Sequence, residues 1–339
     1  MDNIRQILQQ IDQLSFRDKM RLTTRLLEDY LREIPAKTEF DRMDAYQADE
    51  MLPLESTIQN MINQSNEKLV EEGRISSGYP KLDKFTNGFP NGSLTIVGSR
   101  MNKRTEFSLN IVRNILNSGH AVGFVTADFT PDRLARQMLQ LYSGVTMFKP
   151  LKEDDSEKLH LAKSTIEELP FHFKTFNRHF PLIQEVLQVC HKMVTSNNIK
   201  ALFIDPLQQI QSGLTEIPES MEFESDYILT ELKKFAREYE IPVILTSALS
   251  READKRSGDK RPVLSDIRGT NIVEEIADNI LLLNKPSAYG LIEDEEGNDL
   301  KDLTEVIVAK SMNGNTGRVY YRYQADSMIQ EEDIVKTID

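Results

Sequence analysis

Apolar residues at helical spacing dominate the first part of the chain. Residues 1–35 contain two short amphipathic stretches, in which apolar side chains recur every three or four positions until Pro35. We predict a helical hairpin there, then a polar and acidic linker over residues 36–52. A further apolar stripe predicts a helix over residues 53–73, ended by Gly73. The hairpin is too small to bury its own apolar stripe, so we expect it to dock on a neighbour or pair with another copy.

Over residues 74–339 the pattern changes to short apolar runs that alternate with longer amphipathic segments. This alternation is typical of a parallel sheet covered by helices. The predicted strands are Leu94–Val97, Ala121–Thr126, Ala201–Asp205, Pro242–Thr246, Asn279–Leu283, Glu305–Ala309 and a terminal hairpin strand, Arg318–Tyr323. Helices are predicted over Thr105–Leu116 and from Pro131 onward. We therefore predict an α/β fold with a mostly parallel central sheet flanked by helices and a small helical N-terminal segment.

Composition and charge narrow the class of protein. The chain is 39% hydrophobic and 28% charged, and no apolar run approaches the ~20 residues that cross a bilayer. Cys190 is the single cysteine, lies in an apolar helical pattern and is expected to be a buried core thiol, which favours a cytoplasmic protein. Five scattered histidines leave no zinc-type cluster. The net charge of −13 means that any DNA contact requires a local basic patch.

Residues 98–105 have the spacing of a phosphate-binding loop and lack two of its residues. In the usual pattern, G-x-x-x-x-G-K-[ST], backbone N–H groups surround the phosphates, the lysine contacts the β/γ oxygens and the hydroxyl binds Mg²⁺. Gly98 and Thr105 match, whereas Lys103 stands at the second glycine and Arg104 at the lysine. A Cβ at residue 103 obstructs the approach of backbone to phosphate, and a guanidinium is wider than an ammonium. We predict a misshapen loop; the alternative is that both cations still bind phosphate.

Asp205 ends a predicted strand and is the candidate partner of Thr105 in holding Mg²⁺. A hydroxyl plus a strand-end carboxylate is the usual pair for this metal in phosphate-loop proteins. The alternative is that Asp205 only caps a helix or a loop. ATP and Mg²⁺ are thus the candidate cofactors if the site is competent, and otherwise we expect none.

Short motifs along the chain add a family resemblance. They are S-G-Y-P-K-L-D at 77–83, I-D-P-L-Q at 204–208, D-K-R-P at 259–262, S-D-I-R at 265–268, A-D at 277–278 and N-G-N-T-G at 313–317. In this order they resemble the C-terminal motor domain of the DnaB-type replicative helicases, over about residues 53–332. The resemblance implies a RecA-like P-loop fold for residues 74–339. It also implies a linker helix at 53–73 that packs on the adjacent subunit of a hexamer.

Positions where the resemblance implies catalytic groups carry other residues. Asp128 stands where the family has the glutamate that polarises the attacking water, and it is one methylene shorter, which is enough to spoil in-line geometry. Ala248 replaces the glutamine that senses the γ-phosphate. Met312, after Lys310, replaces the arginine finger offered to the neighbouring subunit, a group worth about 10³–10⁵ in rate. Asp128 and Asp205 are the candidate catalytic residues, and Lys310 and Met312 the candidate inter-subunit residues.

A basic segment between two predicted strands is the candidate DNA-binding surface. Its residues are Arg251, Lys255, Arg256, Lys260, Arg261 and Arg268. The resemblance places it in a loop that lines the channel of the ring, and basic side chains there suit sequence-independent contact with single-stranded DNA. Acidic residues dilute the segment and no aromatic residue is interleaved, so a solvated loop is the alternative. The acidic stretch Gln211–Asp226 has no basic residue and is predicted to be a solvent-facing loop.

Together these signals predict a DnaB-like helicase-domain homologue with a degenerate ATP site. We expect a non-hydrolysing binding or scaffold protein in replication-associated DNA processing. Two alternatives stay open: an active ATP-dependent 5′–3′ DNA helicase whose loop tolerates Lys103 and Arg104, and a protein-interaction adaptor that recruits a partner through residues 1–35 without binding DNA. The expected partners are single-stranded DNA and either further copies of the chain, in a hexamer by resemblance, or an active helicase.

Overall fold

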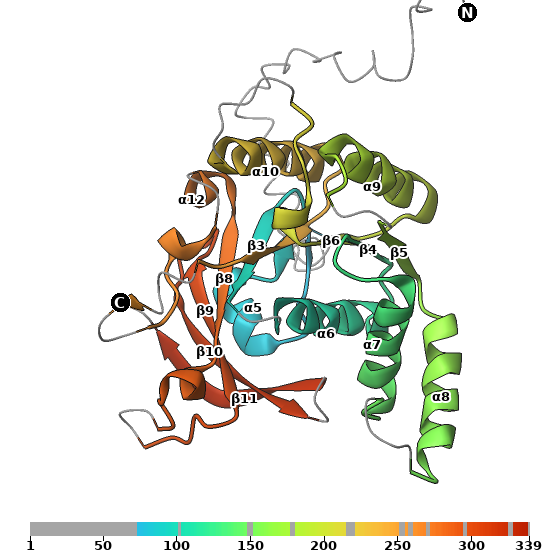
Figure 1. Ribbon diagram of the computed structural model, residues 1–339, viewed down its shortest axis with the longest axis vertical. Coiled ribbons are helices and arrows are strands. Elements are labelled where there is room, and N and C mark those ends of the chain that lie inside the picture. The colour runs from blue at the N-terminus through green and yellow to red at the C-terminus, as the bar shows by residue number, and fades with distance from the viewer. Residues whose placement is uncertain are drawn as a thin grey trace, which may run out of the picture. The chain divides into compact units, whose positions relative to one another are not determined.

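The computed structural model describes residues 73–100, 103–147, 152–176, 180–214, 221–250, 255–256, 260–268, 272–293, 297–324 and 328–337 (Figure 1). The predicted hairpin at 1–35, the linker at 36–52 and the helix at 53–73, Gly73 excepted, lie outside these residues. No helix within the described ranges is long and apolar enough to cross a bilayer.

A nine-stranded sheet forms the centre of the described chain, in the order β11-β10-β9-β8-β3-β7-β6-β4-β5. Strands β8 to β5 in this order pair in parallel, and β9, β10 and β11 continue the sheet antiparallel. The strands are β3 (Leu94–Ser99), β4 (Val122–Thr126), β5 (Phe171–Thr175), β6 (Ala201–Asp205), β7 (Val243–Ala248), β8 (Asn279–Asn284), β9 (Leu303–Lys310), β10 (Gly317–Gln324) and β11 (Met328–Thr337). The predicted mostly parallel sheet is confirmed.

Helices cover both faces of this sheet (Figure 1). One face carries α5 (Pro80–Thr86), α6 (Lys103–Asn117) and α7 (Pro131–Ser143), with α8 (Asp155–Glu167) beside α7. The opposite face carries α9 (Ile183–Asn197) and α10 (Met221–Glu238), with the short α12 (Val273–Ile276) against α10. A small ribbon of β1 (Arg74–Ile75) and β2 (Phe89–Pro90) stands apart from the main sheet.

The buried strands are apolar throughout because both of their faces are covered. Phe124 and Phe203 pack in the layer of α6 and α7, whereas Val125 and Ile204, one residue further along, pack in the layer of α9 and α10. Such strands give continuous apolar runs in the sequence instead of an alternation. Cys190, on α9, is fully buried in the second layer, as predicted.

One loop prediction was wrong. The acidic stretch Gln211–Asp226 was expected to be a loop throughout, but α10 begins at Met221 and includes its last part. The carboxylate of Glu224 accepts a hydrogen bond of 2.9 Å from the backbone N–H of Ser212. Acidic residues in the first turn stabilise a helix through its dipole, so this composition suits a helix start as well as a loop.

The S-G-Y-P-K-L-D motif has a structural role. Asp83 accepts hydrogen bonds from the hydroxyl of Ser76 at 2.6 Å and from the backbone N–H of Ser77 at 3.1 Å. Gly78 has a φ of +77°, and a Cβ there would lie 2.4 Å from the Cβ of Asn114 on α6. The motif therefore closes a turn directly onto α6, and only glycine fits at its second position.

Candidate functional site

The predicted metal pair comes together at the carboxyl end of the parallel strands. Asp205 is the last residue of β6, and Thr105 lies in the first turn of α6. The Oγ1 of Thr105 donates a 3.0 Å hydrogen bond to Oδ2 of Asp205, and the Oγ1 of Thr246 on β7 donates to Oδ1. Both carboxylate oxygens thus have hydroxyl partners supplied by neighbouring elements.

The Asp205 carboxyl group is buried, with 2% of the residue exposed. Burial raises its pKa above the usual value, because a charged carboxylate loses its hydration. Hydrogen bonds from Thr246 and Thr105 and the charge of Arg104 oppose that shift, while the charge of Asp128 adds to it. The protonation of Asp205 is therefore set by its burial and by Thr246, Arg104, Thr105 and Asp128.

Arg104 occupies the space beside this carboxylate. Its Nε lies 3.9 Å from Oδ1 of Asp205, and its side chain is 11% exposed. That Nε is buried and makes no hydrogen bond. Mg²⁺ bound between Thr105 and Asp205 would meet a guanidinium charge at close range, so the residues present fit ATP·Mg²⁺ poorly. Within the described ranges, no group of three or more His, Cys, Asp or Glu side chains is placed to hold a metal.

In this structure Lys103 pairs with a residue of its own helix, and Gly98 is part of a strand of the sheet. Lys103 is the first residue of α6, and its Nζ lies 2.5 Å from Oε2 of Glu106, one turn along the helix. Gly98 belongs to β3, where a Cβ would come within 2.8 Å of a Leu249 methyl group and 3.0 Å of a Leu282 methyl group. Glycine at residue 98 thus leaves room for the Leu249 and Leu282 side chains that pack over the strand.

Asp128, the second candidate catalytic carboxylate, follows β4 near Asp205. It accepts a 3.0 Å hydrogen bond from the side-chain amide of Gln209, and its backbone N–H donates to Oγ1 of Thr126. Thr126 is paired in register with Asp205. Sequence reasoning missed Gln209 and Thr246 as members of this site; the signal for Thr246 was a hydroxyl residue at the end of the apolar run that forms β7.

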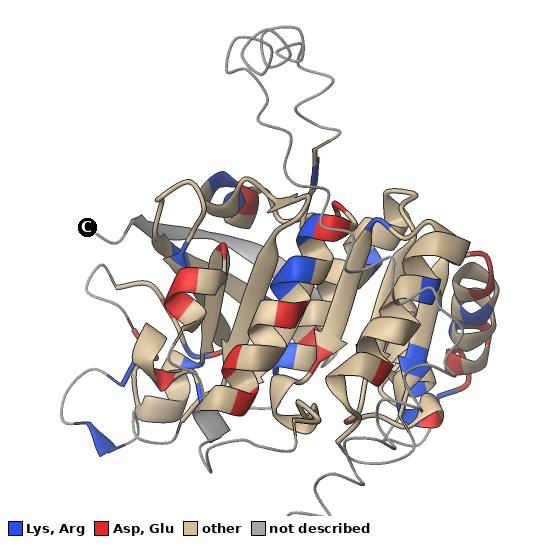
Figure 2. Cartoon of the chain, turned by 90° about the horizontal axis from the view of Figure 1, so that it is seen from above, with Lys and Arg blue, Asp and Glu red and all other residues tan. Residues whose placement is uncertain are grey.

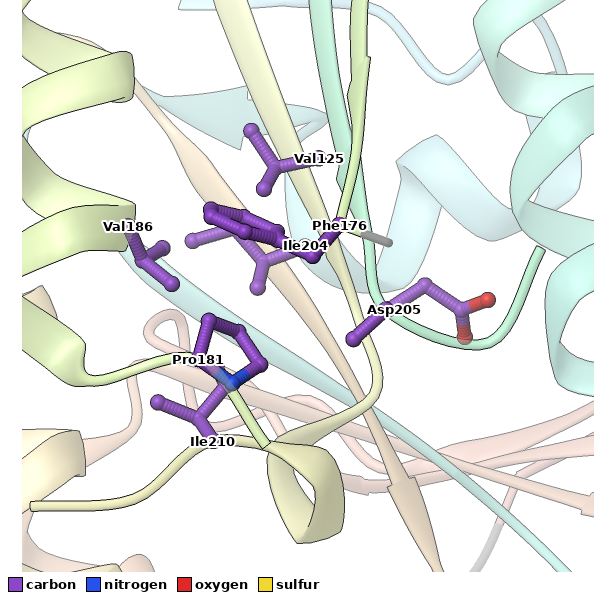
Figure 3. A pocket seen from close by; sticks show the side chains of 8 residues that line it. Val125, Phe176, Pro181, Val186, Ile204, Asp205 and Ile210 are labelled. Atoms are coloured by element: carbon purple, nitrogen blue, oxygen red, sulfur yellow. The ribbon is translucent and has the colours of Figure 1, made fainter. Parts of the chain in front are cut away.

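A small hollow lies beside β6, on the side away from the Asp205 carboxylate (Figure 3). It measures about 10 Å³, enough for roughly one water molecule and far below the few hundred Å³ of a nucleotide pocket. Its lining residues are Val125, Ala127, Phe176, Pro181, Val186, Ile204, Asp205 and Ile210. Figure 3 shows the Asp205 carboxylate turned away from the apolar side chains, so this hollow is not the candidate site.

Two of the candidate DNA-binding residues are engaged with internal carboxylates. Arg256 forms an ion pair with Asp266, and the Nε of Arg261 lies 2.9 and 3.0 Å from the two oxygens of Glu305, which is fully buried. Both guanidinium groups are therefore held by carboxylates of the same chain.

The other predicted cations differ in position. Lys255 and Arg268 are exposed, and Lys260 is half-buried with its Nζ 6.0 Å from the centre of the Tyr289 ring. Arg251 lies outside the described residues. Figure 2 shows Lys and Arg positions interspersed with Asp and Glu positions along the helices in view.

The two candidate inter-subunit residues, Lys310 at the end of β9 and Met312 just after it, have different surroundings. The Nζ of Lys310 donates to the backbone carbonyls of Glu274, in α12, at 2.6 Å and of Ala277, the residue that follows this helix, at 2.7 Å. Met312 is 62% exposed. Lys310 thus has a role within its own chain, and the inter-subunit role of both residues stays a prediction.

Comparisons with known proteins agree with this architecture. The chain is 31% identical over 259 residues to a probable replicative DNA helicase of Trieres chinensis, covering 74% of this chain and 56% of that protein. It is also 31% identical over 309 residues to the replicative DNA helicase DnaB of Helicobacter pylori strain J99, covering 80% and 62%. The chain therefore spans about six tenths of the length of these curated relatives.

Two solved structures share the fold. A DnaB-like replicative helicase, described with its interactions with primase, superposes with a TM-score of 0.69 at 22% identity, over 91% of this chain and 73% of that one. A second structure, an isolated ATPase domain, gives 0.69 at 23% identity, over 83% and 97%. These matches confirm the predicted RecA-like fold. The model of the DnaB-like helicase C terminal domain matches residues 74–331, and the chain belongs to that family.

Proposed function

We propose that this chain is a DnaB-type motor domain with a degenerate ATP site. It acts as a non-hydrolysing binding or scaffold protein in cytoplasmic, replication-associated DNA processing. It assembles with copies of itself or with an active helicase. The family relation supports the link to replication, because the curated relatives are replicative DNA helicases.

The observation that carries the proposal is the place of Arg104. The positively charged side chain of Arg104 lies next to the carboxylate of Asp205. Mg²⁺ would have to bind the same carboxylate. Both oxygens of Asp205 already accept hydroxyl hydrogen bonds, from Thr105 and Thr246. Binding of ATP·Mg²⁺ would require Arg104 to leave this position and two hydrogen bonds to rearrange. Charge repulsion between guanidinium and metal opposes that exchange.

The surroundings of the other catalytic positions support the same conclusion. Asp128, at the position of the water-polarising glutamate, is held by the side chain of Gln209. Ala248 has no group that can sense a γ-phosphate, and Met312 carries no charge for a neighbouring site. Phosphoryl transfer depends on positioned charges, so the loss of several together removes most of the rate enhancement.

Binding calorimetry on the full chain tests the proposal directly. We expect no saturable heat with ATP·Mg²⁺ for the wild type. The double variant Lys103→Gly/Arg104→Lys restores the usual loop residues and is expected to gain measurable binding, with a circular dichroism spectrum like that of the wild type. Saturable binding of ATP·Mg²⁺ by the wild type, equal to that of the double variant, would contradict the proposal.

The two alternative functions give different results. An active helicase would turn over ATP with single-stranded DNA present and lose that turnover on Asp205→Asn. An adaptor would show no binding of single-stranded DNA at low salt, and would form a complex that depends on residues 1–35. The proposed scaffold function predicts salt-sensitive DNA binding without turnover.

A further inference from the structure

Arg100 joins the phosphate-loop strand to the basic segment. It follows β3 directly, and its Nη2 donates hydrogen bonds to the backbone carbonyl of Lys260 at 2.7 Å and to Oδ1 of Asn284 at 3.3 Å. The guanidinium also stacks on Tyr289, with Cζ 4.6 Å from the ring centre. One planar group thus contacts two parts of the chain that are distant from it in the sequence, Lys260 and the region of Asn284 and Tyr289.

The contacts continue from Asn284 to a buried carboxylate. The side-chain amide of Asn284 donates at 2.8 Å to Glu305, which is fully buried. Glu305 also accepts from Nε of Arg261 and, at 2.9 Å, from the hydroxyl of Tyr320. Burial, together with the charge of Glu305, raises the pKa of Tyr320 to about 12, so this hydroxyl remains a neutral donor. Glu305 is therefore a shared acceptor whose donors come from β8, β10 and the basic segment.

We infer that Arg100 is a positioning residue. When no nucleotide is bound, it holds residues 260–268 in place against the end of β3. In this arrangement the backbone of Lys260 is fixed by Arg100 and the side chain of Arg261 is fixed by Glu305. Backbone bonds pin the far end of the segment, since the N–H of Arg268 donates to the carbonyl of Ala248. The segment is thus anchored at both ends.

Such anchoring matters for binding because a segment that is already ordered loses little conformational entropy when it meets a ligand. The inference rests on the proposed function only in taking residues 260–268 as part of the DNA-contacting surface. A lysine at residue 100 could donate to both oxygens, because both bonds come from the single Nη2 atom, but it has no planar group to stack on the Tyr289 ring. Stacking on Tyr289 therefore distinguishes arginine from lysine at this position.

Hydrogen exchange of backbone amides in the full chain, measured by mass spectrometry, tests this role. In Arg100→Ala we expect amides of residues 260–268 to exchange about tenfold faster, the effect of losing about one net hydrogen bond's worth of local stability. Amides of β4 and β6 should be unchanged. Arg100→Lys should fall between the wild type and Arg100→Ala.

Arg133→Ala is the matched control. Arg133 also stacks on an aromatic ring, with Cζ 3.9 Å from the centre of the Phe129 ring, but it contacts neither Lys260 nor Asn284. Its removal should leave exchange of residues 260–268 at the wild-type rate. Unchanged exchange of these amides in Arg100→Ala overturns the inference. So does equal acceleration in β4 and β6, since that shows a general loss of stability.

The same experiment separates this inference from the proposed function. Protection of residues 98–105 by added ATP·Mg²⁺ in the wild type would contradict the degenerate site. A local effect of Arg100→Ala in nucleotide-free protein would still support the positioning role of Arg100.

Discussion

The Nε of Arg104 lies 3.9 Å from Oδ1 of Asp205, and the side chain of Asp205 is fully buried. A buried carboxylate is stable only with partners, and here the partners are two hydroxyl groups and this guanidinium. The site that the family resemblance assigns to a metal is thus occupied by contacts within the chain. This relationship makes Asp205 a stability determinant as well as a candidate ligand.

Asp205 should make stability depend on pH. Burial raises its pKa in the folded state, so the folded state binds the proton more tightly than the unfolded state does. The contribution of this carboxyl is fully present below its unfolded pKa, about 4, and is lost as the pH rises through the folded value. Wild type should therefore lose stability relative to Asp205→Asn as the pH rises above about 4. Urea unfolding of both proteins across this range measures the difference.

Arg104→Met provides the second arm of that experiment. The charge of Arg104 lowers the pKa of Asp205, so its removal should raise that pKa further, and the loss of stability that begins near pH ~4 should continue to higher pH and become larger. If all three proteins show parallel stability curves, Asp205 does not titrate differently in the folded state and the interpretation of the site is wrong.

Arg261 should matter for folding whether or not it contacts DNA. Arg261→Ala leaves the buried carboxylate of Glu305 without its closest cation and should lower the free energy of unfolding by about 3 kcal/mol. Lys255→Ala, at an exposed position, should change it by less than about 0.5 kcal/mol. Urea titration followed by circular dichroism measures both. Equal effects for the two variants would contradict the role given to Glu305.

DNA binding should depend on the exposed cations of the basic segment. We expect the affinity for an oligothymidylate, measured by fluorescence anisotropy, to fall as salt rises. Lys255→Ala/Arg268→Ala should lower the slope of log K against log salt by about 1.4 if each residue contacts one phosphate. Lys158→Ala/Lys163→Ala, which removes two exposed cations of α8, is the control and should leave the slope unchanged. Equal slopes for all three proteins would place the DNA contact elsewhere.

Lys310 and Met312 should differ in their effect on stability. Lys310→Met removes two hydrogen bonds to backbone carbonyls of the α12 segment and should lower the free energy of unfolding by about 1–3 kcal/mol. Met312→Ala should change it by less than about 0.5 kcal/mol, because the side chain is exposed. Thermal unfolding of the two variants and the wild type provides the measurement. A purely inter-subunit role for Lys310 predicts no change in the isolated chain at low concentration.

Much of the sheet could be predicted because its strands are buried on both faces. The runs that became β3, β6, β7 and β8 are apolar and bounded by polar or turn residues, which separates them from amphipathic helices. The sequence analysis did not predict β5 or α8. Strand β5 lies at the edge of the sheet and leaves Phe173 47% exposed, so its pattern lacks the continuous burial of the central strands. Helix α8 buries only Ala162, and its apolar stripe is correspondingly weak.

The sequence by itself determined the family, the sheet and the replacement of the loop glycine and lysine, since these follow from residue types at fixed local spacing. Only the tertiary structure decided what the replacements do. It placed Arg104 against Asp205 and joined Arg261 to Glu305 across the chain. These partners are not fixed by any pattern, because a charged side chain pairs with whichever buried carboxylate the fold brings within reach.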